Sequence, residues 1–196
     1  MLRKLFSYQT SIYIDLLSSY PLKMNTFEFI IRKATQEDIE RIAFINAESW
    51  KTTYQGVVTQ SFLNTLTAEQ QLPRAKRLVE SSEISCFVAY DKKLTLVIGF
   101  ACFGKNREPK VDADSELQAI YLLQEHQGLG VGKMLFEFGI RELKENLKKR
   151  MMVSVFEANK TARDFYERQG GRLIGGDHVD LAGVRYPTST YIWNLQ

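Results

Sequence analysis

The stretch Gln124–Met134, QEHQGLGVGKM, lies past the middle of a chain of 196 residues and decides how the rest of the chain is interpreted. Its glycines Gly128, Gly130 and Gly132 stand at alternate positions, a pattern typical of a loop that wraps around a phosphate. Three kinds of site use such loops: the P-loop of nucleotide hydrolases, the dinucleotide-binding turn and the coenzyme A site. Each implies different chemistry, and the neighbouring residues distinguish them.

Two of these sites are excluded by the residue types around the glycines. A P-loop needs G-x-x-x-x-G-K-[ST], because the hydroxyl holds magnesium. Here Lys133 follows Gly132, but Met134 takes the place of the hydroxyl and Gln127 that of the first glycine. The dinucleotide pattern G-x-G-x-x-G also fails, because Lys133 stands where the third glycine belongs. What remains is Q-x-x-G-x-G, formed by Gln127, Gly130 and Gly132.

The segments around the loop alternate between strand and helix patterns. A strand, ELQAIYLL, precedes the loop, and a helix follows whose apolar stripe is Phe136, Ile140, Leu143 and Leu147. The run Lys148–Arg150 is expected at the end of this helix, where cations suit the helix dipole. Further elements are predicted from their periodicity: strands near 27–31, 85–90, 94–103, 151–157, 171–181 and 184–195, and helices after 35, over 69–80 and from 159 to 170.

This order of elements predicts an α/β protein with a mixed sheet in a single domain. Residues 1–23 are expected to form an N-terminal extension, with an amphipathic helix stopped by Pro21. Met24 opens a fresh strand pattern, so the domain is expected to cover 24–196. Whether the extension is a functional element or lies upstream of the true start is left open.

Two segments resemble a known family. ELQAIYLLQEHQGLGVGKMLFEFGI, residues 116–140, resembles the acetyl-CoA-binding motif of the GNAT superfamily of N-acetyltransferases. VFEANKTARDFYERQGGRLIG, residues 155–175, resembles the strand-helix block that follows it in that family. The resemblance implies a GNAT-like acyl-CoA N-acyltransferase fold with a central splayed sheet flanked by helices. It also implies acetyl-CoA as the donor cosubstrate, with no metal.

The resemblance assigns cofactor binding to the loop and its flanks. In the family, the loop grips the coenzyme A pyrophosphate through backbone N–H groups, and the pantetheine arm bonds to the backbone of the preceding strand. A helix-capping Asn often adds a contact to the arm. Carried over to this chain, the cofactor-binding residues are Ile120, Leu122, Gln127, Gly128, Leu129, Gly130, Val131, Gly132, Lys133 and Asn159.

The resemblance also suggests two catalytic residues. Tyr166 matches the tyrosine that serves the leaving thiolate, although an aromatic residue in the core is the other interpretation. Proton transfer from a tyrosine to a thiolate is uphill by about 2 kcal/mol, so hydrogen-bond donation is as plausible as full transfer. Glu116 is the first candidate for the general base, against the alternative that it belongs to the solvated turn DADSE. Several family members rely on a water chain instead.

Acetyl transfer to an amine is the predicted reaction. The enzyme would move an acetyl group from acetyl-CoA to a primary amine, by direct attack in a ternary complex. Glu48, Trp50 and Tyr54 are expected to line the acceptor site, where aromatic faces and a carboxylate suit a small cationic amine. Trp50 and Tyr54 also fit an ordinary core. The alternatives are a protein or peptide N-acetyltransferase and a non-catalytic acyl-CoA-binding sensor.

Composition narrows the remaining classes of function. The net charge of +3, with no dense basic run among aromatics, argues against nucleic acid as a partner. No apolar run approaches the roughly 18 residues that span a bilayer, so neither a membrane partner nor a membrane anchor is expected. No Cys or His pair has metal-ligand spacing. A cytoplasmic protein is predicted, and a homodimer is expected because homodimers are common in the family.

Overall fold

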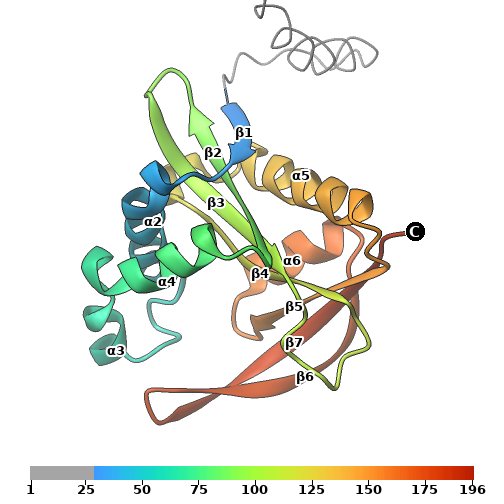
Figure 1. Ribbon diagram of the computed structural model, residues 1–196. Helices are drawn as coiled ribbons and strands as arrows, with labels where there is room; N and C mark the ends of the chain where they lie inside the picture. Colours follow the sequence, from blue (N-terminus) through green and yellow to red (C-terminus); the bar gives the residue numbers. More distant parts are fainter. Residues whose placement is uncertain (1–28) are drawn as a thin grey trace, which may run out of the picture.

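The computed structural model describes residues 29–196, so the predicted extension over 1–23 and the predicted domain start at Met24 lie outside the described residues. Within residues 29–196, seven strands form one mixed sheet in the order β1-β2-β3-β4-β5-β7-β6 (Figure 1). The neighbours β4 and β5 are parallel and the other pairs are antiparallel. The strands are β1 Phe29–Lys33, β2 Ile84–Asp91, β3 Leu96–Gly104, β4 Ser115–Leu122, β5 Arg150–Phe156, β6 Arg172–Leu181 and β7 Val184–Asn194.

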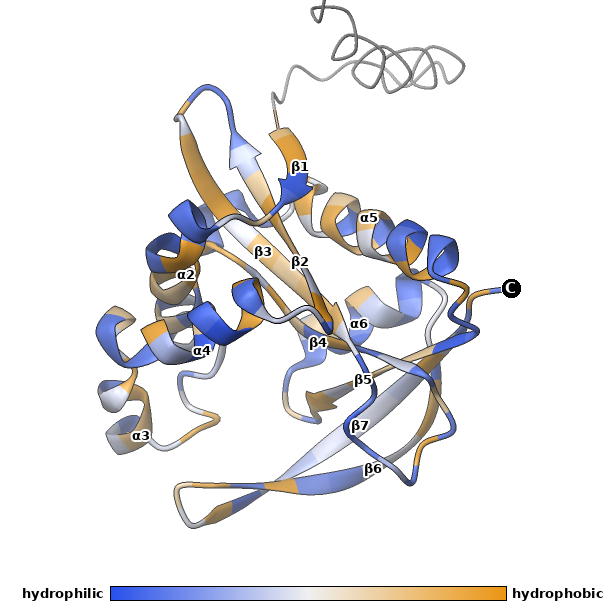
Figure 2. Cartoon of the chain, in the orientation of Figure 1, coloured by the Kyte–Doolittle hydropathy of each residue, from blue (hydrophilic) through white to orange (hydrophobic). Residues whose placement is uncertain are grey.

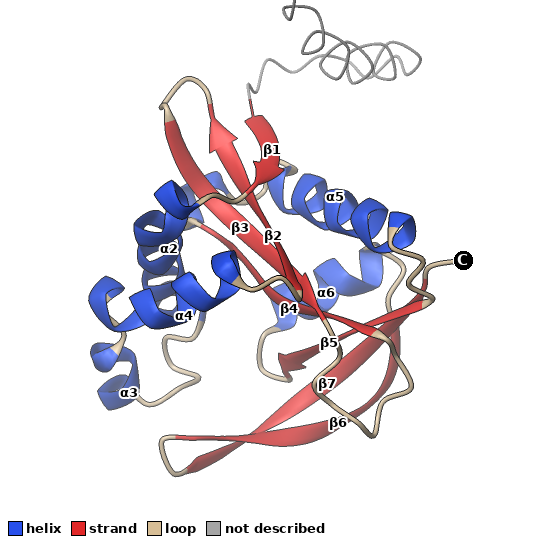
Figure 3. Cartoon of the chain, in the orientation of Figure 1, coloured by secondary structure: helices blue, strands red, loops and turns tan. Residues whose placement is uncertain are grey.

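Helices cover both faces of this sheet (Figure 3). They are η1 Gln36–Asp38, α2 Ile39–Thr53, α3 Gln60–Thr65, α4 Ala68–Glu80, η2 Gln124–His126, α5 Val131–Glu145 and α6 Lys160–Arg168. Helices α2 and α4 pack on one face of the sheet, and α5 and α6 pack on the other. Each face has its own apolar cluster. Apolar residues are concentrated along the central strands (Figure 2). Among residues 29–196, no helix is both long and apolar enough to span a bilayer.

The predicted α/β order is confirmed, but the predicted end of the long helix is wrong. Leu147, expected on the apolar stripe, is 84% exposed with a positive φ of 56°. The helix ends before it, because the Lys148 N–H returns to the Leu143 carbonyl and the Leu147 N–H to that of Lys144, which is a Schellman-type ending. Arg150, expected at the helix end, begins β5 instead.

The strands β4 and β5 separate soon after they begin. Their pairing is limited to Ser115 with Met151 and Glu116 with Met152. Two residues further on, Gln118 is the extra residue of a bulge in β4, and such bulges increase the local twist of a strand. Beyond Glu116, the edge of β4 that faces β5 therefore carries backbone N–H and C=O groups outside the ladder. We refer to this opening between β4 and β5 as the seam.

Candidate active site

The glycine loop meets the end of the seam at the start of α5. Gly128 and Gly130 have φ of 76° and 84°, a left-handed backbone that favours glycine. A Cβ added at either glycine would meet no protein atom within 4 Å. The Met134 N–H donates to the Gly130 carbonyl at 3.1 Å, so the N–H groups of residues 131–133 precede the first helical hydrogen bond. These N–H groups at the helix start, beside open space, fit the pyrophosphate of coenzyme A.

Side chains around the loop mainly hold it in place. The Gln127 Nε2 donates to the Leu122 carbonyl at 3.0 Å, which ties the loop to the end of β4. Lys133 lies 3.6 Å from Glu137 on the outer side of α5, and Leu129 is exposed. Any contact of these residues with a phosphate would therefore be made by backbone N–H groups or by the exposed Lys133 ammonium.

The seam fits the remainder of the cofactor. The side chains of Ile120 and Leu122 pack against the cluster beneath α5 and α6, so their predicted cofactor contacts fall to the backbone. The β4 backbone pairs with β3 on one side only along this stretch. Amide groups of an extended pantetheine arm have the hydrogen-bonding pattern of a short strand, and the free edge of β4 matches it.

Tyr166, from α6, is a buried aromatic residue near the seam. Its ring packs against Phe165, Tyr191 and Trp193 at centroid distances of 5.5, 5.9 and 5.9 Å. Burial, followed by the nearby Tyr121 hydroxyl, raises the pKa of Tyr166 well above its ordinary value. Within residues 29–196, no hydrogen bond occupies its hydroxyl. The ring is therefore core, while the hydroxyl remains available to a bound molecule.

Two more tyrosines, from other elements, lie close enough to Tyr166 to interact with it or with each other electrostatically. Tyr54 follows α2, and its pKa is raised, above all by burial, with Tyr121, Asn159 and Tyr166 among the groups that act on it. Tyr121 lies on β4 near Trp50, and it shifts the pKa of both Tyr54 and Tyr166. The structure thus brings together α2, β4 and the start of α6. We call this set of Trp50, Tyr54, Tyr121, Asn159 and Tyr166 the tyrosine cluster.

Tyr121 is a residue of the candidate site that sequence reasoning missed. It alternates with Ile120 and Leu122 along β4, and its ring packs on the opposite face, 5.7 Å from Phe100. The alternation of a strand would have placed it on the α2 side once the sheet faces were known. Asn159 caps α6, since its Oδ1 accepts from the Ala162 N–H at 3.1 Å.

Glu48 does not lie with the predicted acceptor aromatics. Its carboxylate pairs with Lys51 at 2.9 Å, and both side chains are about 40% exposed. A helix turns about 100° per residue, so Glu48 and Trp50 project about 200° apart on α2. Trp50 and Tyr54 instead pack against each other, with ring centroids 4.7 Å apart and planes tilted by 55°, and both pack against Phe156. The aromatic part of the predicted acceptor site is assembled without the carboxylate.

Glu116 is buried and already engaged in an ion pair. Its Oε2 accepts from the Arg107 backbone N–H at 3.0 Å and from Nε at 2.9 Å, and its Oε1 accepts from Nη2. This bond is the main reason why the pKa of Arg107 is raised. Glu116 shares a sheet face with Met152 and, two and four residues on, with Ser154 and Phe156, so it faces the α2 side. It is therefore not the solvated turn residue of the alternative interpretation.

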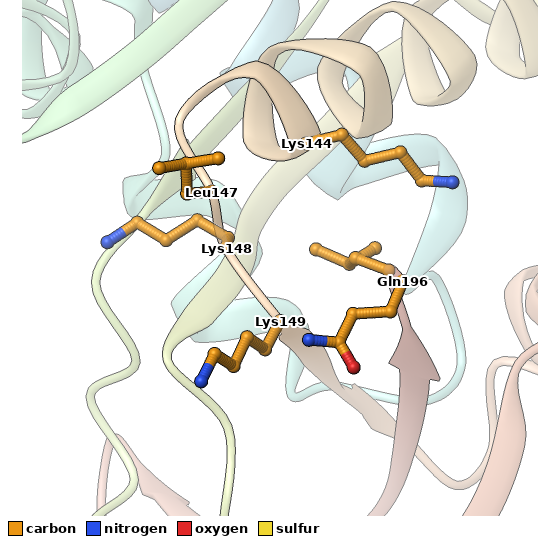
Figure 4. A pocket seen from close by; sticks show the side chains of 6 residues that line it. Lys144, Leu147, Lys148, Lys149 and Gln196 are labelled. Atoms are coloured by element: carbon orange, nitrogen blue, oxygen red, sulfur yellow. The ribbon is translucent and has the colours of Figure 1, made fainter.

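Two shallow hollows lie far from this chemistry. The first, of about 410 Å³, lies between the start of β5 and the C-terminus. The second, of about 300 Å³, lies between the end of α5 and the C-terminus (Figure 4). Helix α5 has 15 residues, which at about 1.5 Å per residue puts this end about 20 Å from the glycine loop. Lys144, Lys148 and Lys149 make up half of the lining of the second hollow, and neither hollow includes the tyrosines or the loop. We place the candidate site at the seam.

Known proteins with similar sequences are acetyltransferases. The family model described as the acetyltransferase (GNAT) family matches residues 48–171. An uncharacterized N-acetyltransferase of Bacillus subtilis strain 168, YuaI, is 36% identical over 155 residues, which is 79% of this chain and 87% of that protein. A spermidine N(1)-acetyltransferase of Thermoplasma acidophilum is 26% identical over 161 residues, covering 77% of this chain and 92% of that protein.

A solved structure supports the same fold. The crystal structure of the PaiA N-acetyltransferase from Thermoplasma acidophilum, in complex with coenzyme A, superposes with a TM-score of 0.61 at 22% identity. The match covers 82% of this chain and 97% of that one. The fold is therefore shared with a protein whose crystal structure contains coenzyme A.

Proposed function

Since the chain belongs to the GNAT family of acetyltransferases, we propose that it moves the acetyl group of acetyl-CoA to the primary amine of a small cationic molecule, by direct attack in a ternary complex. That it is an acetyl-CoA-dependent acyltransferase follows from the family. What we propose is the identity of the acceptor, a small cationic amine, and its direct attack in a ternary complex. The Thermoplasma relative, a spermidine N(1)-acetyltransferase, supports a small amine as the acceptor.

One observation carries the proposal: the Tyr166 hydroxyl is free of hydrogen bonds within residues 29–196 and belongs to the tyrosine cluster beside the seam. A thioester whose pyrophosphate lies on the glycine loop and whose arm follows β4 would bring its sulfur to this part of the sheet. The α2 side of the cluster supplies the faces of Trp50 and Tyr54, which attract an ammonium group. Donor and acceptor would then meet at the cluster.

The chemistry requires one bond to form and one to break. The amine nitrogen attacks the thioester carbonyl, the C–N bond forms, and the C–S bond breaks with its electron pair on sulfur. Tyr166 is proposed to donate a hydrogen bond to the developing thiolate. Its raised pKa makes full proton transfer even less favourable than for an ordinary tyrosine, so hydrogen-bond donation is the role that we assign.

The amine must lose a proton before or during attack, and Glu116 is the proposed acceptor of that proton. Both of its oxygens are held by Arg107, so we expect the acceptor or a water molecule to displace part of this contact. The ion pair would hold the Glu116 carboxylate in one orientation at the start of β4 until the acceptor arrives.

Glu116→Gln is expected to lower kcat/KM by about tenfold or more, because the amide cannot take up the proton of the amine. Arg107→Gln is expected to lower kcat/KM by less, because the carboxylate stays but loses the two side-chain hydrogen bonds that position it. The measurement is kcat/KM of each variant beside the native enzyme. Native values in Glu116→Gln would show that the proton is taken up elsewhere and that Glu116 is not the base.

Ligand-dependent unfolding and an amine panel test the function. Acetyl-CoA at 100 times its Kd is expected to add about 2.7 kcal/mol to the free energy of unfolding, because it binds only the folded chain. NAD and ATP are the controls, and stabilisation by either of them instead would overturn the proposal. Free-thiol release with polyamines, amino acids, aminoglycosides and peptides then identifies the acceptor. Stabilisation without release by any amine would indicate a sensor, and release by peptides alone a peptide acetyltransferase.

Cytoplasmic location and a homodimer belong to the same proposal. The absence of a membrane-spanning helix among residues 29–196 agrees with a cytoplasmic location. Sedimentation of the full chain with and without acetyl-CoA measures whether it is a homodimer.

A further inference from the structure

Arg74, on α4, carries a buried donor that no group in the described chain satisfies. Its Nε is inaccessible to solvent and has no hydrogen-bond partner within residues 29–196, and no ion pair there includes its guanidinium. Arg32 and Arg107, by contrast, each hold a carboxylate in two hydrogen bonds. An unsatisfied buried donor is unfavourable, so a partner that satisfied it would stabilise this arrangement.

The fold directs this arginine to the acceptor side of the sheet. Helices α2 and α4 lie side by side over one face of the sheet (Figure 1), and Ala75 and Leu72 of α4 pack in the same cluster as Tyr121. The Arg74 charge opposes the effect of burial on the pKa of Tyr121 and of the Cys102 thiol. The guanidinium therefore lies over β3 and β4, next to the Tyr121 end of the tyrosine cluster.

A second orphan atom lies in the same interface. Asn46, on α2 and fully buried, donates to the Gln71 Oε1 at 3.3 Å, but its Oδ1 has no partner within residues 29–196. Gln71 is three residues before Arg74 on α4, so both orphan atoms belong to the α2–α4 contact. Asn46 is also one turn before Trp50. A free cationic donor and a free neutral acceptor thus lie beside the aromatic cluster.

We propose that the acceptor is an amino acid or a close analogue, whose carboxylate binds the Arg74 guanidinium while its amine faces the tyrosine cluster. This inference rests on the proposed acetyl transfer to an amine, and it replaces the small cation by a zwitterion that carries a carboxylate beside its ammonium group. A guanidinium presents a planar fork that matches a carboxylate in two hydrogen bonds. The same cation repels an acceptor with positive charge at both ends, so polyamines are disfavoured relative to zwitterions.

The test compares acceptors that differ only in the acid. The full chain is assayed with amino acids and with their primary amides, which keep the amine and lose the carboxylate charge. The native enzyme is expected to prefer the best amino acid over its amide by about 30-fold in kcat/KM, equivalent to about 2 kcal/mol for a charged hydrogen bond. Arg74→Gln is expected to abolish this preference by raising the KM for the amino acid about 30-fold, with the amide unchanged.

Arg77, three residues further along α4 and exposed, is the matched control. Arg77→Gln is expected to retain the preference for the amino acid over its amide. Arg74→Lys keeps the positive charge but lacks the planar guanidinium, so it is expected to retain part of that preference. An unchanged KM for acetyl-CoA and a native-like Tm show that Arg74→Gln is folded. If amides and polyamines are acetylated as well as amino acids, and Arg74→Gln changes none of them, this inference fails while the proposed function stands. If no amine releases thiol, the proposed function itself fails.

Discussion

Replacing Tyr166 with phenylalanine is expected to lower kcat by about 100-fold while the Kd for acetyl-CoA changes less than twofold. The ring is held by Phe165, Tyr191 and Trp193, so phenylalanine keeps the packing and removes only the hydroxyl. A donor that acts on charge developing in the transition state typically contributes a factor of 10²–10³. The thiolate carries that charge only after attack, so the loss appears in kcat and not in cofactor binding. Stopped-assay kinetics and calorimetric titration measure the two quantities.

Tyr191 provides the control for this substitution. It packs against Tyr166 in the same cluster, and its hydroxyl donates to Glu167 at 2.8 Å, away from the free hydroxyl of Tyr166. Tyr191→Phe is expected to cost about 1 kcal/mol of stability and to leave kcat within twofold. Equal kcat values in Tyr166→Phe and the native enzyme would remove Tyr166 from the mechanism.

The raised pKa of Tyr166 gives this role a pH signature. Its hydroxyl stays protonated as the pH rises past the ordinary value near 10, because burial penalises the phenolate. Loss of the hydrogen-bond donor therefore adds no basic limb to the kcat profile below pH 10. A basic limb there that disappears in Tyr166→Phe would contradict the assigned state of the hydroxyl.

The features that can be predicted from sequence are those that depend on local rules. Left-handed backbone at Gly128 and Gly130 requires a particular residue type, and strand alternation or helix periodicity marks the elements around the loop. The mixed α/β order follows from these patterns, and the structure confirms it. The cofactor-binding residues remain predictions that the loop geometry fits. The acetyl-CoA site can be predicted from such local rules because its loop is one contiguous segment of the chain.

The acceptor side depends on contacts between segments that are distant in sequence. Arg107, in the loop between β3 and β4, donates a hydrogen bond to Glu116. The periodicity of a single segment does not predict that pairing. Glu48 is near Trp50 in sequence but about 200° away around α2, which only helix geometry reveals. Tyr121 joins the site because α2, β4 and α6 converge there. Arg74 looks like one of many cations on a charged helix until the packing of α4 buries its Nε.

Gly130→Ala is expected to weaken acetyl-CoA binding by about 100-fold, with kcat at saturating acetyl-CoA lowered much less. The added Cβ meets no protein atom, so it would extend into the open space in which the pyrophosphate is expected to lie. Alanine also resists a φ of 84°, so the loop tends to turn its N–H groups away from the anion. The loss of two charged hydrogen bonds, about 3 kcal/mol together, corresponds to this factor. Titration of acetyl-CoA by calorimetry measures it.

The backbone strain of this substitution has a matched control in Gly183. This residue lies in the β6–β7 turn with a φ of 77°, and its Cβ would likewise meet no atom within 4 Å. Both substitutions put alanine into the left-handed region, at about 1–2 kcal/mol each, so both should lower stability similarly. Only Gly130→Ala should alter acetyl-CoA binding, because only Gly130 lies at the start of α5. If Gly183→Ala weakened acetyl-CoA equally, the effect would be general strain, and the glycine loop would not be the pyrophosphate site.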